Sequence, residues 1–166
     1  AGLAALATLL AGFGAWGDFL TLIGRVSDPI TTPHNFTVGA VAYRAGLSRD
    51  AASMLQWASM AAVLALVVVA ALRTAAVPSY LVALIASQLL SPILWDHYAL
   101  LLLVPVAWLL ARRQWWAALI PLATSVVLVG AIPAFVYPAA FWVSLVAVLV
   151  VGGQRHSQMG PASGSS

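Results

Sequence analysis

Long runs without a charged side chain, such as Ala61–Leu72 and Ala139–Val151, constrain the fold of this chain more than any other feature. Hydrophobic residues make up 63% of the sequence and charged residues only 7%, whereas a soluble domain carries roughly 25% charged residues. Too few polar side chains are present to cover a globule in water. A bilayer tolerates such apolar surfaces, because helices satisfy their backbone hydrogen bonds internally. We therefore expect an all-α fold, a polytopic transmembrane helix bundle.

The apolar runs predict about five to six membrane segments, together with helices that lie in the membrane interface. The segments expected are Gly2 to Phe13, Ala51 to Leu72, Ala76 to Leu90, Pro92 to Ala111, Trp115 to Ile132 and Ala139 to Val151. The first resembles the exit half of a helix, and the chain begins without Met. We therefore expect a native protein that extends further at its N-terminus.

Arginines predict the orientation of these segments. Four of them fall at alternate connections, on one side of the bilayer: Arg73, Arg112, Arg113 and Arg155. Short loops rich in Arg are cytoplasmic, so the opposite, extracytoplasmic side should hold residues 16–49, 91–98 and 133–138. Arg25, Arg44 and Arg49 depart from this rule, and an anionic ligand is one reason for an Arg on that side.

Residues 15–50 are expected to form extracytoplasmic interfacial helices and a loop, between a truncated helix at 1–14 and the bundle at 51–152. Trp16 would anchor the first of these helices in the interface. The Pro-punctuated segment Asp28–Asn35 predicts a loop. A second helix is expected from Phe36 to Ala45 and should end at Gly46, after which Ser48 would cap the next helix with Asp50 in its first turn. Residues 153–166 are Gly- and Ser-rich and predict a disordered cytoplasmic tail.

The segment Ser91–Tyr98 carries the most informative polar side chains. Ser91 followed by Pro92 is typical of a helix start, which would place Asp96 and His97 roughly 6–8 Å inside the helix. An Asp-His pair at the edge of the hydrocarbon region is unfavourable unless partnered, and indicates an anion- or proton-handling site. The alternative is structural, with Asp96 accepting backbone N–H groups and His97 lying in the interface like Trp95.

A second polar cluster on the same predicted side contains His34, Asn35, Thr37 and Arg44. Residues 35–37 also match the N-glycosylation pattern, which is common by chance, and Arg44 can equally be an interfacial, snorkelling Arg. The histidines have no local spacing typical of metal ligands, and Cys is absent from the sequence, so we expect no metal site. No basic patch indicates nucleic-acid binding, and we expect no cofactor.

Both clusters resemble motifs of a known family. Ser91-Pro-Ile-Leu-Trp-Asp-His-Tyr98 resembles the "SPxxWxHH" signature of the family 87 glycosyltransferases, which are bacterial GT-C membrane enzymes that include polyprenol-phosphate-mannose-dependent mannosyltransferases. Asn35-Phe-Thr-Val38 with Arg44 resembles the upstream "N-x-S-L … R-x-x" stretch of that family. Tyr98 stands where the family has a second His, and Thr37 where it has Ser. The resemblance covers about Trp16–Arg113.

This resemblance implies the C-terminal half of an enzyme of a bacterial plasma membrane, with its active face extracytoplasmic. The reaction would move a hexose, such as mannose, from a polyprenyl-phosphate donor to a glycan or glycolipid acceptor. GT-C enzymes carry their catalytic carboxylate in a first extracytoplasmic loop, so it is predicted outside this chain, and this part alone should be inactive. Asp96 and His97 would support catalysis. The expected substrate-binding residues are His34, Asn35, Thr37, Arg44, Ser91, Trp95 and Tyr98.

Individual roles stay open within that set. His97 and Arg44 suit the lipid phosphate; Asp96 would orient His97 or contact sugar hydroxyls, and Asn35 would bind sugar or fix the loop. Two other classes of protein remain: a transporter or flippase-like module in which Asp96 and His97 form a proton relay, and an enzyme of another class or a scaffold subunit.

Overall fold

The computed structural model describes residues 2–26, 28–125 and 131–158, and side chains within all of these ranges except residues 2–7, 10–11, 23–26 and 155–158. The described part of the chain is helical and contains no strand. The expected all-α fold is therefore confirmed. The described helices are α1 (Gly2–Val26), α2 (Val38–Arg44), α3 (Arg49–Arg73), α4 (Ala76–Leu89), η1 (Asp96–Leu102, a 3₁₀ helix), α5 (Leu103–Leu110), η2 (Trp115–Ala118, also 3₁₀), α6 (Leu119–Ala123) and α8 (Val136–Gln158).

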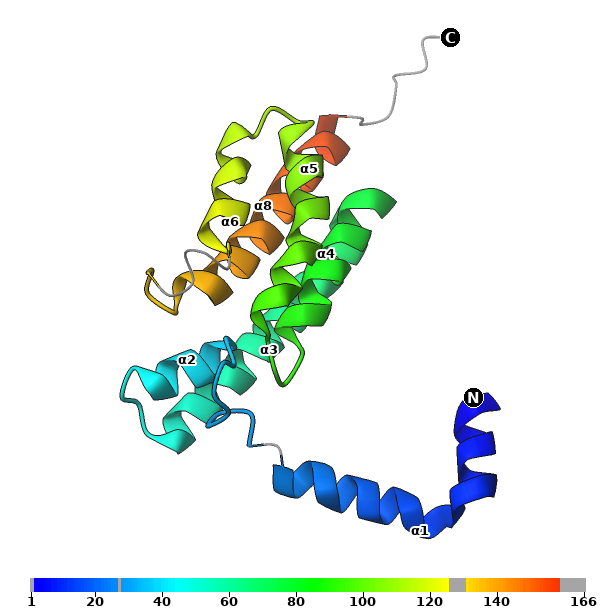
Figure 1. The fold of residues 1–166 in the computed structure, drawn as a ribbon. Helices are drawn as coiled ribbons and strands as arrows, with labels where there is room; N and C mark the ends of the chain where they lie inside the picture. The colour runs from blue at the N-terminus through cyan, green and yellow to red at the C-terminus, as the bar shows by residue number, and fades with distance from the viewer. Residues whose placement is uncertain (1, 27, 126–130, 159–166) are drawn as a thin grey trace.

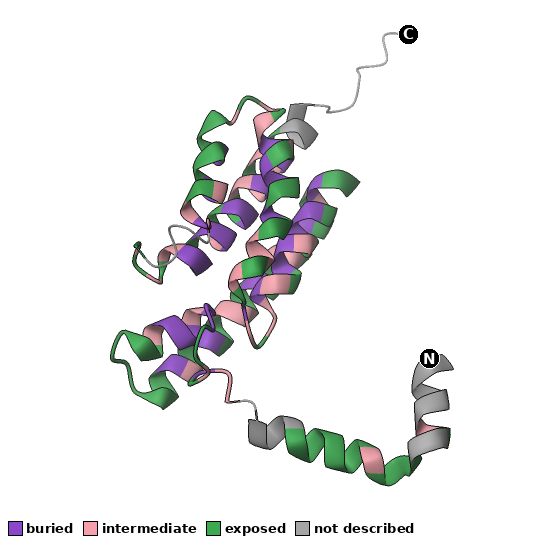
Figure 2. Cartoon of the chain, viewed as in Figure 1, coloured by how far each residue is buried: buried purple, intermediate pink, exposed green. Residues whose placement is uncertain are grey.

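The helices from α3 onwards form a bundle, with α4 packed against α3 and α8, and α5 and α6 against α8 (Figure 1). Large apolar side chains such as Phe141, Leu145, Ile85 and Leu109 are fully buried between them. Figure 2 shows buried positions mostly where the helices face one another, and exposed positions on their outer sides. The apolar periodicity thus buries one side of each helix and leaves a second apolar side uncovered.

Two of the helices, Arg49–Arg73 and Val136–Gln154, are long and apolar enough to cross a membrane, within the residues that the structure describes. In α3 only 17% of the apolar window is buried. The boundaries of α3 follow the sequence signals closely: Ser48 accepts the Ala51 N–H at 3.3 Å as N-cap, Asp50 lies in the first turn, and Arg73 lies in the last turn. Each of these features stabilises the helix end at which it lies.

Other predicted segments differ from the structure. Across residues 115–125 the structure has only η2 and the short α6, which ends before Thr124. Residues 126–130, in the C-terminal part of this predicted span, lie outside the described residues. At the other end of the bundle, α8 continues to Gln158, where the tail was expected to be disordered from residue 153. The remaining tail residues, 159–166, lie outside the described residues.

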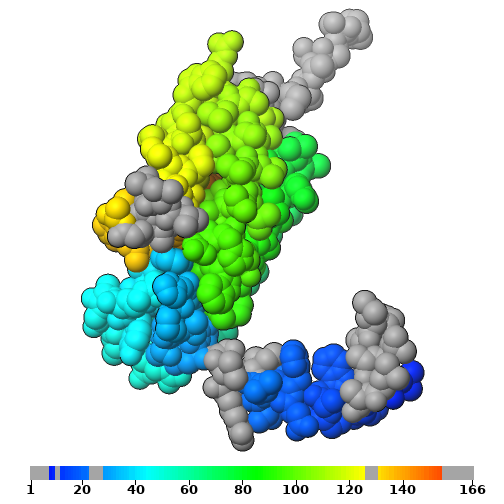
Figure 3. Space-filling model, viewed as in Figure 1, coloured from blue at the N-terminus to red at the C-terminus, as the bar shows by residue number. Residues whose placement is uncertain are grey.

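Helix α1 lies apart from the bundle (Figures 1 and 3). It bends at Gly12, whose φ of 77° and ψ of 165° are non-helical, near the boundary expected between residues 1–14 and 15–50. Phe13, Phe19 and Leu20 are exposed on it. Helix α2, by contrast, packs closely on α3, since a Cβ at Gly39 would lie 2.7 Å from the Ala52 carbonyl oxygen.

The connections alternate between the two ends of the bundle (Figure 1). Residues 74–75 and 111–114 lie at one end, with Arg73, Arg112 and Arg113. Residues 28–48, 90–95 and 131–135 lie at the other, which we call the α2 end. The two polar segments singled out in the sequence therefore meet at one end of the bundle.

Candidate functional site

The side chain of Asn35 joins the two polar segments. Its amide nitrogen donates to the carbonyl oxygens of Pro29 (2.6 Å) and Pro92 (3.1 Å), and its amide oxygen accepts the N–H groups of Thr37 (3.0 Å) and Leu94 (2.9 Å). The residue is fully buried. Both donors and both acceptor positions of the amide are thus in use. Of the two expected roles of Asn35, this geometry favours fixing the loop over binding a sugar.

This junction explains why the predicted helix start at Ser91-Pro92 is wrong. Residues 91–95 are not helical, because two carbonyl oxygens that a helix would use there are bonded elsewhere: that of Pro92 accepts from Asn35 at 3.1 Å, and that of Leu94 accepts the N–H of Phe36 at 2.9 Å. Ser91 instead closes a local turn, in which its hydroxyl donates to the Ile93 carbonyl at 2.7 Å. Helix η1 begins only at Asp96, with Trp95 as its N-cap residue.

Asp96 and His97 therefore lie at the very start of η1 and not a turn inside a helix. The Asp96 carboxylate accepts the N–H of His97 at 2.9 Å, and its Oδ1 lies 3.5 Å from His97 Nδ1. Their side chains are 44% and 64% exposed, respectively. Since the carboxylate accepts the His97 N–H, that N–H group is not free to bind an anionic ligand. The pair faces a cavity of about 370 Å³ that Pro121, Thr124 and Ser125 also line.

Aromatic rings surround His97. Its ring stacks on Trp95 with 6.3 Å between centroids and meets Tyr98 edge-on at 4.7 Å. Trp95 is 36% exposed, whereas Tyr98 is partly buried against the core. A carboxylate, an imidazole and an accessible indole thus lie side by side, which is a combination that can bind hydroxyl groups and the apolar face of a sugar ring.

Tyr137 holds the backbone of this cluster in place, although the sequence analysis did not single it out. Its hydroxyl, buried at the start of α8, bonds to the carbonyl oxygens of Trp95 (2.8 Å) and Asp96 and accepts the N–H of Ala99 at 3.1 Å. Its ring packs on Phe36 at 4.8 Å. The only signal in the sequence is its place in the connection 133–138, on the same predicted side as the other two segments.

The remaining candidates are more widely placed. Thr37 is buried and accepts the Ala40 N–H at 3.4 Å as the N-cap of α2. His34 is exposed in the loop, with a φ of 58°. Arg44 lies in the last turn of α2, with its guanidinium 5.6 Å from the centroid of the Phe36 ring. Phe36 and Tyr137 therefore lie between Arg44 and the backbone of Asp96.

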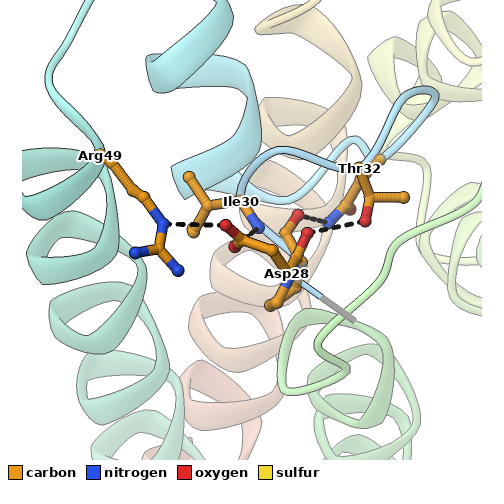
Figure 4. A network of polar contacts seen from close by, with 6 residues as sticks. Asp28, Ile30, Thr32 and Arg49 are labelled. Carbon is orange, nitrogen blue, oxygen red and sulfur yellow. Dashed lines mark hydrogen bonds and ion pairs between the residues drawn. The ribbon is translucent and has the colours of Figure 1, made fainter. Parts of the chain in front are cut away.

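The loop before Asn35 is held to α3 by an ion pair (Figure 4). Arg49 Nε donates to the Asp28 carboxylate at 2.8 Å, and the N–H of Ile30 donates to the other carboxylate oxygen at 3.1 Å. Desolvation, the largest single influence, raises the pKa of Asp28, but these bonds, the charge of Arg49 and the hydroxyl of Thr31 together lower it below the ordinary value. The carboxylate therefore stabilises the loop in its ionised form.

The described residues contain no group of three His, Asp or Glu side chains that could hold a metal ion. Comparison with protein-family models found no matching family, and searches of curated proteins and of solved structures found no match.

Proposed function

We propose that this chain is the C-terminal part of a multi-pass glycosyltransferase in the plasma membrane of a bacterium. The enzyme would move a hexose, such as mannose, from a polyprenyl-phosphate donor to a glycan or glycolipid acceptor on the extracytoplasmic side. The observation that carries the proposal is the Asn35 junction. It ties residues 35–44 to residues 91–98, the two segments that resemble the family 87 signatures, through hydrogen bonds that cross 57 and 59 positions of sequence.

The surface of the helices supports a membrane location. An apolar helix of a soluble protein is buried in the core, but α3 keeps most of its apolar window exposed. Exposed large side chains on it include Leu64, Val68 and Leu72. A contiguous apolar surface of this kind is stable in lipid and unfavourable in water.

The cluster at the start of η1 suits the sugar side of such a reaction. An acceptor hydroxyl would attack the anomeric carbon as the bond to the lipid phosphate breaks, and a carboxylate elsewhere in the full-length protein would take the hydroxyl proton. Asp96 and His97 would hold sugar hydroxyls, with the Trp95 ring against the sugar face. Tyr137 would act as a positioning residue, because it holds the backbone from which Trp95 and Asp96 project.

The test is transfer of labelled hexose from a polyprenyl-phosphate carrier by the intact protein in membranes. The variant His97→Ala should lower transfer on the order of tenfold, the effect of a lost hydrogen bond to the sugar, while Tyr80→Ala, an exposed aromatic on α4, should not. Near-normal transfer by His97→Ala would remove His97 from the site. Proton-coupled solute uptake into vesicles, without any sugar transfer, would instead support the transporter alternative.

A further inference from the structure

An apolar groove with a volume of about 920 Å³ opens at the α2 end of the bundle, apart from the Asp96–His97 cavity. Its walls come from α2, the N-terminal part of α3 and the first turns of α8, with Val41, Leu55, Pro138 and Trp142 among the lining side chains. Figure 3 shows the segment near residue 135 directly beside α2 on the molecular surface. Two distant parts of the sequence thus build one apolar surface.

Among the residues that the structure describes, Arg44 is the one charged residue that lines this groove. Among the described residues it has no carboxylate within ion-pair distance, and desolvation lowers its pKa. A partly desolvated cation without a counter-charge is unfavourable. An anion bound there would supply that charge, and the guanidinium fork matches phosphate oxygens. The groove is therefore complementary to an amphiphile with an anionic head.

A second groove, of about 540 Å³, continues the apolar surface along α8. Trp142 lines both grooves, and the second one follows Val143, Val146 and Val150 to Gln154. At 1.5 Å per residue, the path from Pro138 to Gln154 is roughly 24 Å long. Half of a hydrocarbon core about 30 Å thick measures about 15 Å. A chain lying along both grooves would thus extend beyond one leaflet.

We propose that this surface binds a long-chain lipid monophosphate, with its phosphate on Arg44 and its chain along α8 past Trp142. The inference rests on the proposed function in one respect only, since in the glycosyltransferase this lipid would be the sugar carrier.

The experiment is photo-crosslinking of the intact protein in phosphatidylcholine vesicles with a polyprenyl monophosphate that carries a diazirine in its chain. Labelling is expected on peptides of α8 that contain Trp142–Val150. Arg44→Gln should reduce labelling on the order of tenfold, the effect of one lost charged hydrogen bond, whereas Arg73→Gln, at the other end of α3, should not. Ala139→Phe should also reduce it, because Ala139 is exposed in the groove and the larger ring would fill it.

The following outcomes would overturn the proposal. Equal labelling of both variants and of wild type would exclude this groove as the lipid site. Absence of label from α8 would also exclude it, and would indicate that another segment or a second copy of the chain covers the groove. Equal labelling by the corresponding polyprenol would exclude recognition of the phosphate. Competition by inorganic phosphate as strong as by the lipid would show a site for the free anion. Specific labelling without hexose transfer would contradict the proposed function alone, and transfer unaffected by Arg44→Gln would contradict the groove alone.

Discussion

Replacing Asn35 with Ala should separate the two polar segments at the α2 end of the bundle. The substitution removes four hydrogen bonds from a fully buried side chain. At a net value of about 1 kcal/mol for each bond, the loss is about 4 kcal/mol. The backbone groups left behind include the N–H groups of Thr37 and Leu94, which would open to water together.

Hydrogen–deuterium exchange of the intact protein in detergent measures this opening directly. Because about 1.4 kcal/mol corresponds to a factor of ten, amides at Thr37 and Leu94 should exchange up to roughly 1,000-fold faster in Asn35→Ala, while core amides of α4 change little. Asn35→Asp should also speed exchange, because its carboxylate oxygens would face the carbonyls of Pro29 and Pro92. Gln88→Ala, which removes an exposed amide, is the matched control. Unchanged protection at Leu94 in Asn35→Ala would refute the junction as the element that joins the segments.

Three further predictions follow from contacts near the site. Tyr137→Phe should expose the Ala99 N–H to exchange and lower hexose transfer with little loss of folded protein, because only the hydroxyl that holds the start of η1 is removed. Normal transfer together with normal exchange would contradict the positioning role of Tyr137. Gly39→Ala should destabilise the protein by about 1–3 kcal/mol through overpacking of α2 on α3, measured as a lower Tm. Gly14→Ala, with open space around the residue, should not lower the Tm. Equal Tm values for Gly39→Ala and wild type would show that α2 is not closely packed on α3. The pKa of Asp28 is lower in the folded state, so its carboxylate should stabilise the loop fully above the ordinary pKa of about 3.9 and lose this effect as pH falls through the lowered pKa. Asp28→Asn should therefore make stability depend less on pH in this range of an acid-unfolding curve. An unchanged curve would contradict the ion pair.

Features that depend on neighbouring residues could be predicted from the sequence. The start and end of α3 follow from Ser48, Asp50 and Arg73, all of which act within one turn of the helix end. The expected helix from Phe36 to Ala45 is present as Val38–Arg44, and Gly46 follows it with a φ of 103°. Capping groups and a left-handed Gly act locally, so no tertiary information is needed to find them.

Features that depend on distant residues could not be predicted in this way. Ser91-Pro92 has the local chemistry of a helix start, but Asn35, far away in the sequence, binds the Pro92 carbonyl oxygen that the helix would have used. The role of Tyr137 is similar, because its partners Trp95 and Asp96 lie 42 and 41 positions away. The groove beside Arg44 likewise exists only where α2 and α8 meet. In each case tertiary contacts override a local preference or create a site that no single segment contains.

The measurement that tests the central claim most directly is donor use by the purified full-length protein in vesicles. The protein should transfer labelled hexose from a polyprenyl-phosphate carrier to a glycan or glycolipid acceptor, and should not transfer it from a nucleotide sugar. Asn35→Asp should reduce this transfer, because the two segments of the site would no longer be held together. Failure to use any lipid-phosphate sugar, by a protein whose fold is intact, would contradict the glycosyltransferase assignment.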